Sequence, residues 1–298
     1  MTDVTLSIDG TGITVPQGTT LLEACSRLEI DTPTLCHTGS LDPAYACRAC
    51  VVEVGPGALV PACAREATDG LEVSTTSERV ARSRRLVFEL IGSTTDLSNA
   101  ESAILRWGTR LGADPGRFGV HAGAQRRATP HPGHHSAVPA GFAATVAEPA
   151  KVEDELYVRD YARCILCFRC VDACGEQHQN TFAISAAGRG FEARISTEFD
   201  VALPDSACVY CGNCIAVCPT GALVGKVQWD LRQAGEWQPQ HQEITRSVCG
   251  YCGVGCNLEV TTQDGRIVEV GSPADHDVTL GNLCIKGRFG WQFVHADE

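Results

Sequence analysis

The stretch that decides the fold is Cys164-Ile165-Leu166-Cys167-Phe168-Arg169-Cys170-Val171-Asp172-Ala173-Cys174, which has the cysteine spacing C-x2-C-x2-C-x3-C. The same spacing returns at residues 208–218, and Pro219 follows its last cysteine. Corresponding cysteines of the two runs lie 44 positions apart, which indicates a duplicated unit. Three cysteines on one tight turn can hold one face of a metal cluster, and a distant fourth closes it.

This spacing is that of bacterial two-cluster ferredoxins, in which the fourth cysteine of each run ligates the other cluster. The rule predicts two [4Fe-4S] centres built from both runs. Zinc, the alternative metal, prefers two separated C-x2-C pairs, so iron–sulfur chemistry is favoured. The predicted ligands are Cys164, Cys167, Cys170 and Cys218 for one cluster, and Cys208, Cys211, Cys214 and Cys174 for the other.

Composition limits the remaining possibilities. The 298 residues include 17 cysteines and carry a net charge of −12, which argues against nucleic acid as a partner. No apolar run is long enough to predict a membrane span, and the N-terminus lacks the pattern of a secretory signal. We therefore expect a cytoplasmic protein, and in that reducing compartment closely spaced cysteines favour metal ligation over disulfides.

The other cysteines form two further sets of four with different spacings. The N-terminal set is C-x10-C-x2-C-x12-C and the C-terminal set is C-x2-C-x3-C-x27-C. Cys25 is left over, and its place inside an expected helix predicts a small buried apolar residue. The two sets are Cys36, Cys47, Cys50 and Cys63, and Cys249, Cys252, Cys256 and Cys284.

The first 77 residues read as a β-rich domain with one helix. Val4 to Ile8 and Ile13 to Val15 flank a glycine turn, which predicts a hairpin. Thr20 and Glu23 have capping-box spacing before a helix over residues 21–28. Further strands are expected at residues 51–54 and 71–73. This order suits a β-grasp ferredoxin.

Residues 78–150 read as a helical connector and linker. One helix is expected over 77–91, with a solvated face that carries four arginines, and a second over 98–111, capped by Ser98 and Glu101. Residues 113–150 have linker composition. Their histidines are expected to be solvated rather than metal-bound, and the arginines are expected to lie in water rather than at a binding site. These residues are His121, His131, His134, His135, Arg79, Arg82, Arg84 and Arg85.

Two hairpins are expected in the C-terminal half of the chain. One, over 181–185 and 192–196, lies between the cysteine runs, and the other, over 258–262 and 267–270, turns at Asp264-Gly265. Residues 231–243 are polar and read as a second linker. No catalytic acid–base pair or nucleophile is predicted, and no G-x-G-x-x-G motif follows a strand, so a dinucleotide site is not expected.

A family resemblance indicates the function of the N-terminal cysteine set. The strings Pro33-Thr34-Leu35-Cys36-His37, then residues 47–54 (CRACVVEV), then Pro61-Ala62-Cys63, resemble the [2Fe-2S] domain that opens three enzyme groups. These groups are the large iron–sulfur subunit of respiratory complex I, iron-only hydrogenases, and NAD-linked molybdenum or tungsten formate dehydrogenases. The resemblance implies one [2Fe-2S] cluster on this set.

The C-terminal set chooses among the three groups. Residues 249–256 (CGYCGVGC) and 281–289 (GNLCIKGRF) resemble the [4Fe-4S] domain of molybdopterin-dependent oxidoreductases, above all formate dehydrogenases, although Gly250 replaces the family's usual proline. The resemblance implies a third [4Fe-4S] cluster. It also implies that Lys286, just after the fourth cysteine, lies between cluster and pterin as an electron relay; the alternative is a surface lysine.

The chain thus resembles the N-terminal iron–sulfur portion of the catalytic subunit of an NAD-dependent formate dehydrogenase, with two departures. Residues 92–150 contain no cysteine, so the family's extra His-plus-three-Cys cluster is expected to be missing. Nothing follows Glu298, where the molybdopterin domain is expected to begin. We therefore expect a separate subunit whose partners carry the molybdenum or tungsten bis-pterin, FMN and NAD.

The sequence predicts an α+β, modular fold and an electron-transfer role without an active site of its own. The partners expected are a molybdopterin-binding catalytic subunit and a flavin/NAD-binding iron–sulfur subunit. Alternatives are a freestanding multi-cluster carrier, a complex I-like module of another oxidoreductase, or a structural zinc protein. The expected domains are 1–77 (β-grasp [2Fe-2S]), 78–150 (connector), 151–230 (two-cluster ferredoxin) and 244–298 (small [4Fe-4S] domain).

Overall fold

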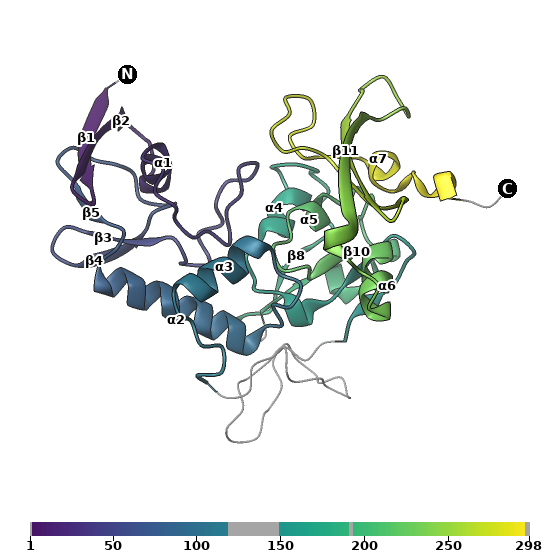
Figure 1. Cartoon of the computed structure of the whole chain (residues 1–298), viewed down its shortest axis with the longest axis horizontal. Coiled ribbons are helices and arrows are strands. Elements are labelled where there is room, and N and C mark those ends of the chain that lie inside the picture. Colours follow the sequence, from purple (N-terminus) through teal and green to yellow (C-terminus); the bar gives the residue numbers. More distant parts are fainter. Residues whose placement is uncertain (1, 119–148, 191–192, 296–298) are drawn as a thin grey trace.

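The computed structural model describes residues 2–118, 149–190 and 193–295. The described residues form four sheets, of which the two-stranded one is inserted in the sequence between two strands of another. In Figure 1 the long helix of residues 78–94 lies beneath the first sheet. The histidines at 121, 131, 134 and 135 and most of the expected linker 113–150 lie outside the described residues.

The N-terminal domain is a five-stranded sheet in the order β2-β1-β5-β3-β4, in which only β1 and β5 pair in parallel. Leu21 and Cys25 of the helix pack on the sheet with no exposed surface, as the sequence predicted for Cys25. Thr20 and Glu23 form the predicted capping box. The elements are β1 (Asp3–Ile8), β2 (Thr11–Pro16), α1 (Leu21–Arg27), β3 (Val51–Val54), β4 (Ala58–Pro61) and β5 (Glu72–Ser74).

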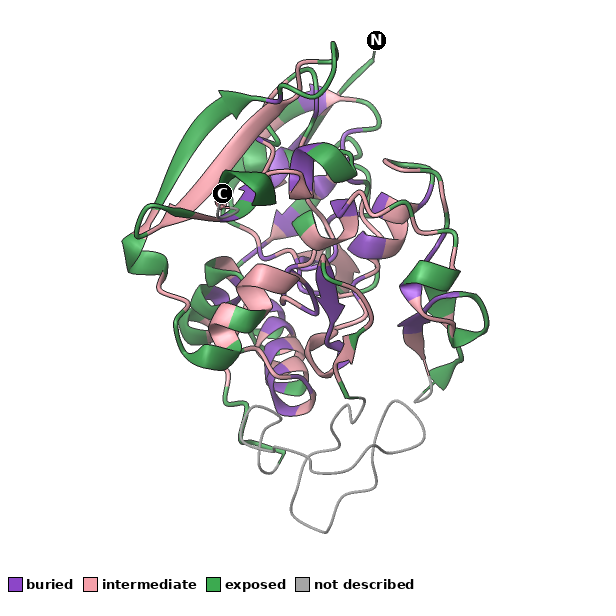
Figure 2. Cartoon of the chain, turned by 90° about the vertical axis from the view of Figure 1, so that its right-hand side faces the viewer, coloured by how far each residue is buried: buried purple, intermediate pink, exposed green. Residues whose placement is uncertain are grey.

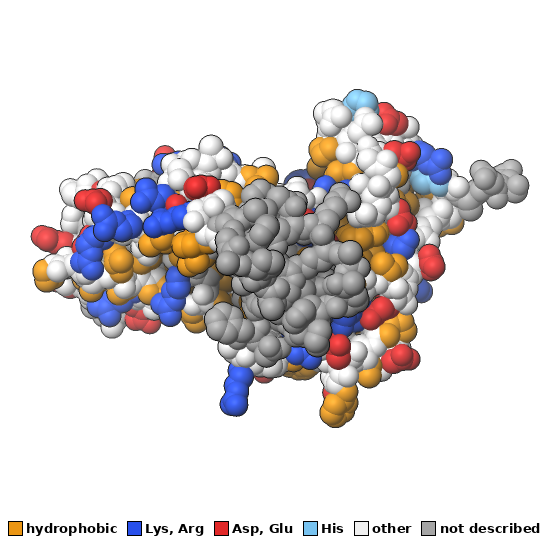
Figure 3. Space-filling model, turned by 90° about the horizontal axis from the view of Figure 1, so that it is seen from below, with side chains coloured by type: hydrophobic (Ala, Val, Ile, Leu, Met, Phe, Trp, Pro, Cys, Tyr) orange, Lys and Arg blue, Asp and Glu red, His pale blue; other side chains and the backbone are white. Residues whose placement is uncertain are grey.

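The connector is built from α2 (Glu78–Thr94) and α3 (Ser102–Arg110). The prediction of a solvated arginine face holds for Arg79, Arg82 and Arg85, whose side chains are exposed. Figure 3 shows Lys and Arg side chains gathered at the left of the face in view. It is wrong for Arg84, which is buried and donates from Nε to the carbonyl of Val51 at 3.0 Å. This bond joins α2 to β3.

The cap predicted for the second connector helix is wrong as well. The helix begins at Ser102 with Glu101 as N-cap, and no side chain caps it. Ser98 instead accepts a hydrogen bond from Arg163, and the Glu101 carboxylate faces Arg169 at 3.5 Å. Both predicted cap residues are therefore used to attach the connector to the ferredoxin domain.

The duplicated unit packs around a three-stranded sheet that the sequence did not predict, in the order β10-β7-β6. The expected hairpin between the two runs is shorter than predicted and begins at Ser185; residues 191–192 of this region are not described. The elements are β6 (Lys151–Val152), β7 (Tyr157–Arg159), α4 (Arg169–Cys174), β8 (Ser185–Ala187), β9 (Arg194–Ser196), α5 (Asn213–Ala216), β10 (Leu223–Gly225) and α6 (Lys226–Ala234). Short 3-10 helices lie at Tyr161–Arg163, Glu198–Asp200 and Leu203–Asp205.

The predicted linker 231–243 is partly helix and partly strand. Helix α6 continues to Ala234, a 3-10 turn covers Pro239–His241, and β11 (Gln242–Val248) follows at once. Strand β11 adds to the predicted hairpin of β12 (Asn257–Gln263) and β13 (Arg266–Gly271) as an edge strand whose residues are mostly exposed (Figure 2). The C-terminal helices are α7 (Ile285–Phe289) and a 3-10 helix at Gln292–His295. Across the described ranges, no helix is both long and apolar enough to span a membrane.

Candidate iron–sulfur centres

The two cysteine runs of the duplicated unit have the same backbone conformation. Leu166 and Tyr210, which lie between the first and second cysteines, both have positive φ, at 53° and 56°. Large side chains seldom adopt this left-handed conformation. It turns the Leu166 amide toward Cys164 Sγ and the Tyr210 amide toward Cys208 Sγ, each at 3.4 Å. The loops are thus shaped to direct backbone N–H groups at sulfur.

Electrostatic neighbours of the buried thiols come from both cysteine runs. Burial raises the pKa of the Cys170 thiol, and Cys164, Cys167, Cys218 and Cys214 add to this rise. In the second half, burial raises the pKa of Cys214, and Cys211, Cys208 and Cys174 add to it. The fourth cysteine of each run therefore lies near the second and third cysteines of the other run.

Tyr157 lies beside the second cysteine run, and the sequence did not predict it as a site residue. It is buried on β7, and its hydroxyl lies 2.7 Å from Cys208 Sγ. Burial raises the pKa of Tyr157, with Cys214 and Cys208 adding to the shift, so the hydroxyl keeps its proton. Its ring stacks on Phe289 of α7 at 6.1 Å between centroids. Only its place in the short apolar stretch 156–158 could have singled it out in the sequence.

The N-terminal set comes together beside α1. Cys50 Sγ and Cys63 Sγ are 3.4 Å apart, and a hydrogen bond from Cys47 lowers the pKa of Cys36 to about 5. The Ala49 amide donates to Cys47 Sγ at 3.5 Å. Cys36, Cys50 and Cys63 are buried and Cys47 is partly buried, so the four thiols form a compact, shielded group.

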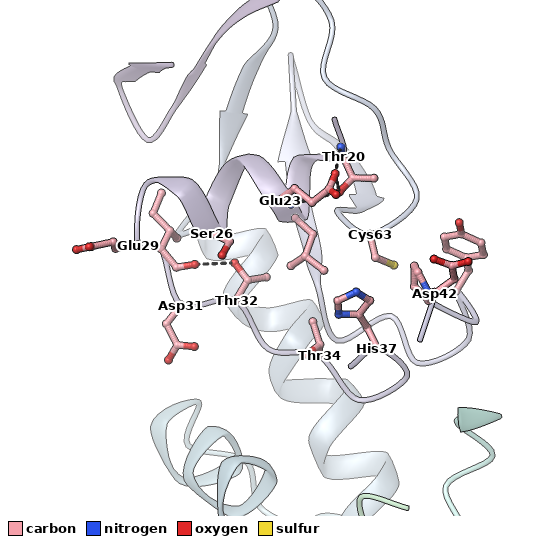
Figure 4. A pocket seen from close by; sticks show the side chains of 14 residues that line it. Thr20, Glu23, Ser26, Glu29, Asp31, Thr32, Thr34, His37, Asp42 and Cys63 are labelled. Atoms are coloured by element: carbon pink, nitrogen blue, oxygen red, sulfur yellow. Dashed lines mark hydrogen bonds between the residues drawn. The ribbon is translucent and has the colours of Figure 1, made fainter. Parts of the chain in front are cut away.

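A polar cleft of about 620 Å³ opens next to this set. Figure 4 shows Cys63 at its wall, with His37 and Asp42 on the loop below and Glu23 on α1 above. Burial, together with the charge of Arg169, lowers the pKa of His37. The N-terminal cysteine set therefore lies close to the molecular surface.

The C-terminal set is more open than the others. Cys249 is buried, Cys256 is partly buried, and Cys252 and Cys284 are exposed. The Cys249 amide donates to the Cys256 carbonyl at 2.8 Å, and burial together with Cys249, Cys252 and Cys284 raises the pKa of Cys256. These four thiols are therefore electrostatic neighbours.

Lys286 lies in the first turn of α7, two residues after Cys284, and its side chain is exposed. It is thus available to a neighbouring molecule or domain, as are the exposed Cys252 and Cys284. The relay role that the resemblance implied for Lys286 stays a prediction.

The residues present fit iron–sulfur clusters. Each of the four sets offers four thiols. Backbone amides donate to sulfur in three of the four predicted ligand sets, and the set of Cys164 receives a second such bond because Leu223 donates to Cys218 Sγ at 3.4 Å. Over the residues that the structure describes, no group of three or more His, Cys, Asp and Glu side chains is placed to hold a single metal ion. The assignment of individual cysteines to clusters stays a prediction.

Comparison with protein families agrees with this chemistry. Residues 1–78 match the 2Fe-2S iron–sulfur cluster binding domain, residues 163–222 match the 4Fe-4S dicluster domain, and residues 242–296 match the molybdopterin oxidoreductase Fe4S4 domain. Three segments of the chain are iron–sulfur domains of known families. The chain is therefore a mixed α/β protein with the iron–sulfur modules of oxidoreductase subunits.

Curated relatives resemble the chain over almost its whole length. The NADPH-Fe(3+) oxidoreductase subunit alpha of Geobacter sulfurreducens is 33% identical over 99% of this chain and 32% of the relative. A subunit of the NADH-quinone oxidoreductase of Rhizobium meliloti is 30% identical, with 99% and 32% covered. A putative formate dehydrogenase of Staphylococcus haemolyticus is 25% identical, with 98% and 31% covered. The chain spans about a third of the length of these relatives.

A solved structure shares the fold. The NAD+-reducing [NiFe]-hydrogenase in the H2-reduced state contains a chain that matches with a TM-score of 0.56 and 25% sequence identity. The match covers 75% of this chain and 87% of that one. Much of the fold of this chain therefore also occurs in a chain of a hydrogenase.

Proposed function

We propose that this chain is an iron–sulfur electron-transfer unit of an NAD-linked, molybdopterin-dependent formate dehydrogenase. The observation that carries the proposal is the gathering of sixteen cysteines into four sets inside three iron–sulfur domains. Bound clusters would supply reversible one-electron chemistry. The chain's own part is to hold the clusters, shield them and tune their potentials.

The ligands proposed are those predicted from the sequence. Cys36, Cys47, Cys50 and Cys63 would hold a [2Fe-2S] cluster, and three [4Fe-4S] clusters would use the remaining sets, with the fourth ligands exchanged between the two ferredoxin runs. The proximity of Cys218 to the first run, and of Cys174 to the second, supports that exchange. Protein dipoles aimed at sulfur, such as the amides of Leu166 and Tyr210, stabilise the added electron.

The molybdopterin part of the proposal rests on the C-terminal domain. Residues 242–296 match a domain type defined in molybdopterin oxidoreductases, and a putative formate dehydrogenase is among the relatives. We propose that the open side of this domain, with Cys252, Cys284 and Lys286, faces a bis-pterin site carried by a following domain or a partner chain. A flavin-bearing, NAD-binding subunit would exchange electrons at the other end of the relay.

The test is native purification followed by reduction with defined donors. We expect a large molybdopterin-binding chain or domain to accompany these residues, and formate to bleach the cluster absorbance and produce reduced-cluster EPR signals. Dithionite reduction of the same sample is the control that all clusters are competent. Clusters that stay oxidised with formate, although dithionite reduces them, would exclude formate as the donor.

A second candidate is an iron–sulfur module of an NAD(P)H-linked oxidoreductase that does not act on formate. It is favoured by the 33% and 30% identities to the NADPH-Fe(3+) oxidoreductase and NADH-quinone oxidoreductase subunits, which exceed the 25% identity to the putative formate dehydrogenase. The same purified sample distinguishes the two. Reduction by NADPH or NADH without any response to formate supports this second function.

A further inference from the structure

One position of the duplicated unit carries two buried polar side chains. Arg169 and Asn213 are equivalent in the repeat, since each directly precedes the third cysteine of its run. They are only 5% and 3% exposed. Their side-chain hydrogen bonds leave the ferredoxin domain and reach the domain on either side of it. Because the residue at this repeat position bonds to a flanking domain in both halves, it is suited to hold the two flanking domains against the ferredoxin domain.

Arg169 reaches the N-terminal domain at the residue next to a predicted cluster ligand. Its Nη2 donates to the carbonyl of His37 at 2.7 Å, and His37 follows Cys36. The Arg169 charge acts on the thiols of both Cys36 and Cys167, which belong to different cysteine sets. The guanidinium therefore lies at the boundary between two candidate clusters.

The same loop of the N-terminal domain is held at further points. Figure 1 shows it reaching from the N-terminal domain toward α4. Gln177 Oε1 accepts from the Asp42 amide at 2.6 Å, and His178 Nε2 lies 2.9 Å from the Ser40 carbonyl. Leu41 packs against the ferredoxin domain in a small buried cluster. The loop after Cys36 is thus docked by several contacts, of which Arg169 is nearest to the ligand.

Asn213 makes the corresponding contact with the C-terminal domain. Its Oδ1 accepts from the Leu283 amide at 3.1 Å, and Leu283 precedes Cys284. It also accepts from Arg288 Nη2 at 3.3 Å, and Arg288 Nε donates to the Cys211 carbonyl at 2.9 Å. A Cβ at Gly212 would collide with the Arg288 side chain, so the two segments are in close contact.

We propose that Arg169 and Asn213 are positioning residues that set the spacing between the ferredoxin clusters and the clusters of the two flanking domains. This inference rests on the proposed electron-transfer function. Burying the Arg169 guanidinium has a desolvation cost, and its Nε has no hydrogen-bond partner among the described residues. The bond from Arg169 to the His37 carbonyl joins the loop after Cys36 to the segment that carries Cys167. It therefore restrains the distance between these two cysteine sets.

The test measures magnetic coupling between clusters in the full chain, purified with its clusters and reduced chemically. Spin relaxation of the [2Fe-2S] EPR signal speeds up when a nearby [4Fe-4S] cluster is also paramagnetic. Because other contacts also hold the loop, we expect Arg169→Gln to weaken this enhancement measurably and Arg169→Lys, which keeps a donor and the charge, to weaken it less. Arg106→Gln, on the exposed face of α3, is the matched control and should leave it unchanged.

Asn213→Ala tests the contact between the ferredoxin domain and the C-terminal domain. It should weaken the coupling between the C-terminal cluster and its ferredoxin neighbour, and it should leave the [2Fe-2S] relaxation as in the wild type. Unchanged coupling in Arg169→Gln overturns the proposal, and so does loss of bound iron, because a residue needed for cluster binding is not a positioning residue. Chemical reduction needs neither formate nor a partner, so this result is independent of the donor tests above.

Discussion

At the scale of single residues, the four sets are not surrounded alike. Tyr157 offers a hydroxyl to Cys208, whereas the polar side chain beside Cys218 is Thr220, at 3.9 Å. Arg288 acts on Cys211 and Cys214 of the second set. Hydrogen bonds and positive charge near the sulfurs favour the reduced cluster. The cluster on Cys208, Cys211 and Cys214 is therefore expected to have its potential raised by these groups.

Tyr157→Phe removes the hydroxyl and leaves the buried ring in place. When Cys208 is a thiolate ligand, the hydroxyl can only donate, so its loss makes reduction less favourable. We expect the potential of one [4Fe-4S] cluster to fall by about 40 mV, the equivalent of about 1 kcal/mol for a one-electron couple. An EPR-monitored redox titration measures it. Tyr45→Phe, half-exposed in the N-terminal domain, is the control, and equal potentials in all three proteins would contradict the assignment.

Single residues also show what a sequence can and cannot predict. The iron–sulfur domains could be predicted because cysteine spacing is local and chemically restrictive, and the ligand sets stay a prediction. Tyr157, Arg169 and Asn213 could not, because their roles depend on which domain packs against them. Ser98 and Glu101 had the spacing of a helix cap, but Arg163 and Arg169 compete for the same side chains, and these tertiary contacts override the local signal.

At the scale of elements, the predicted hairpins and the longer helices were found because their turn residues and apolar periods are strong local signals. The sheet of β6, β7 and β10 was missed because its strands have only two or three residues. Residues 231–243 were read as linker because α6 is polar and β11 is exposed, so neither shows a buried face. Short or one-sided elements depend on their neighbours more than on their own sequence.

Arg84 tests how the connector is attached to the first domain. Arg84→Met keeps the apolar stem of the side chain but removes the bond from Nε to the Val51 carbonyl, which joins α2 to β3. We expect a loss of about 1–3 kcal/mol, seen as a lower apparent melting temperature by circular dichroism. Arg82→Met, on the solvated face, should be close to neutral. An Arg84→Met variant that melts like the wild type would show that the bond contributes nothing.

At the scale of the whole molecule, the two ends of the chain differ in surface. The N-terminal cleft beside Cys63 is lined mainly by polar side chains. The C-terminal domain instead exposes a large share of the molecule's big apolar side chains. They are Ile244, Val248, Tyr251, Val254, Val278, Leu280, Ile285, Phe293 and Val294. So many exposed apolar side chains in one small domain favour contact with another domain or chain.

Strand β11 allows that expectation to be tested without disturbing the clusters. Ile244 is 66% exposed and lies on the outer strand of the C-terminal sheet, five residues before Cys249. The change Ile244→Asp places charge on this strand without altering the core. We expect bound iron to stay at the wild-type level, while the molybdopterin-binding chain or domain is lost from the native complex or becomes more sensitive to proteolysis.

The matched control changes an exposed apolar residue on an edge strand of another domain. Val152, which is 52% exposed on β6 of the ferredoxin unit, is replaced by Asp in the same way. Native mass spectrometry of both variants measures the association. If the β11 variant binds its neighbour as tightly as the control does, the neighbour docks elsewhere, and the pterin site proposed beside Cys252 and Cys284 loses its main structural support.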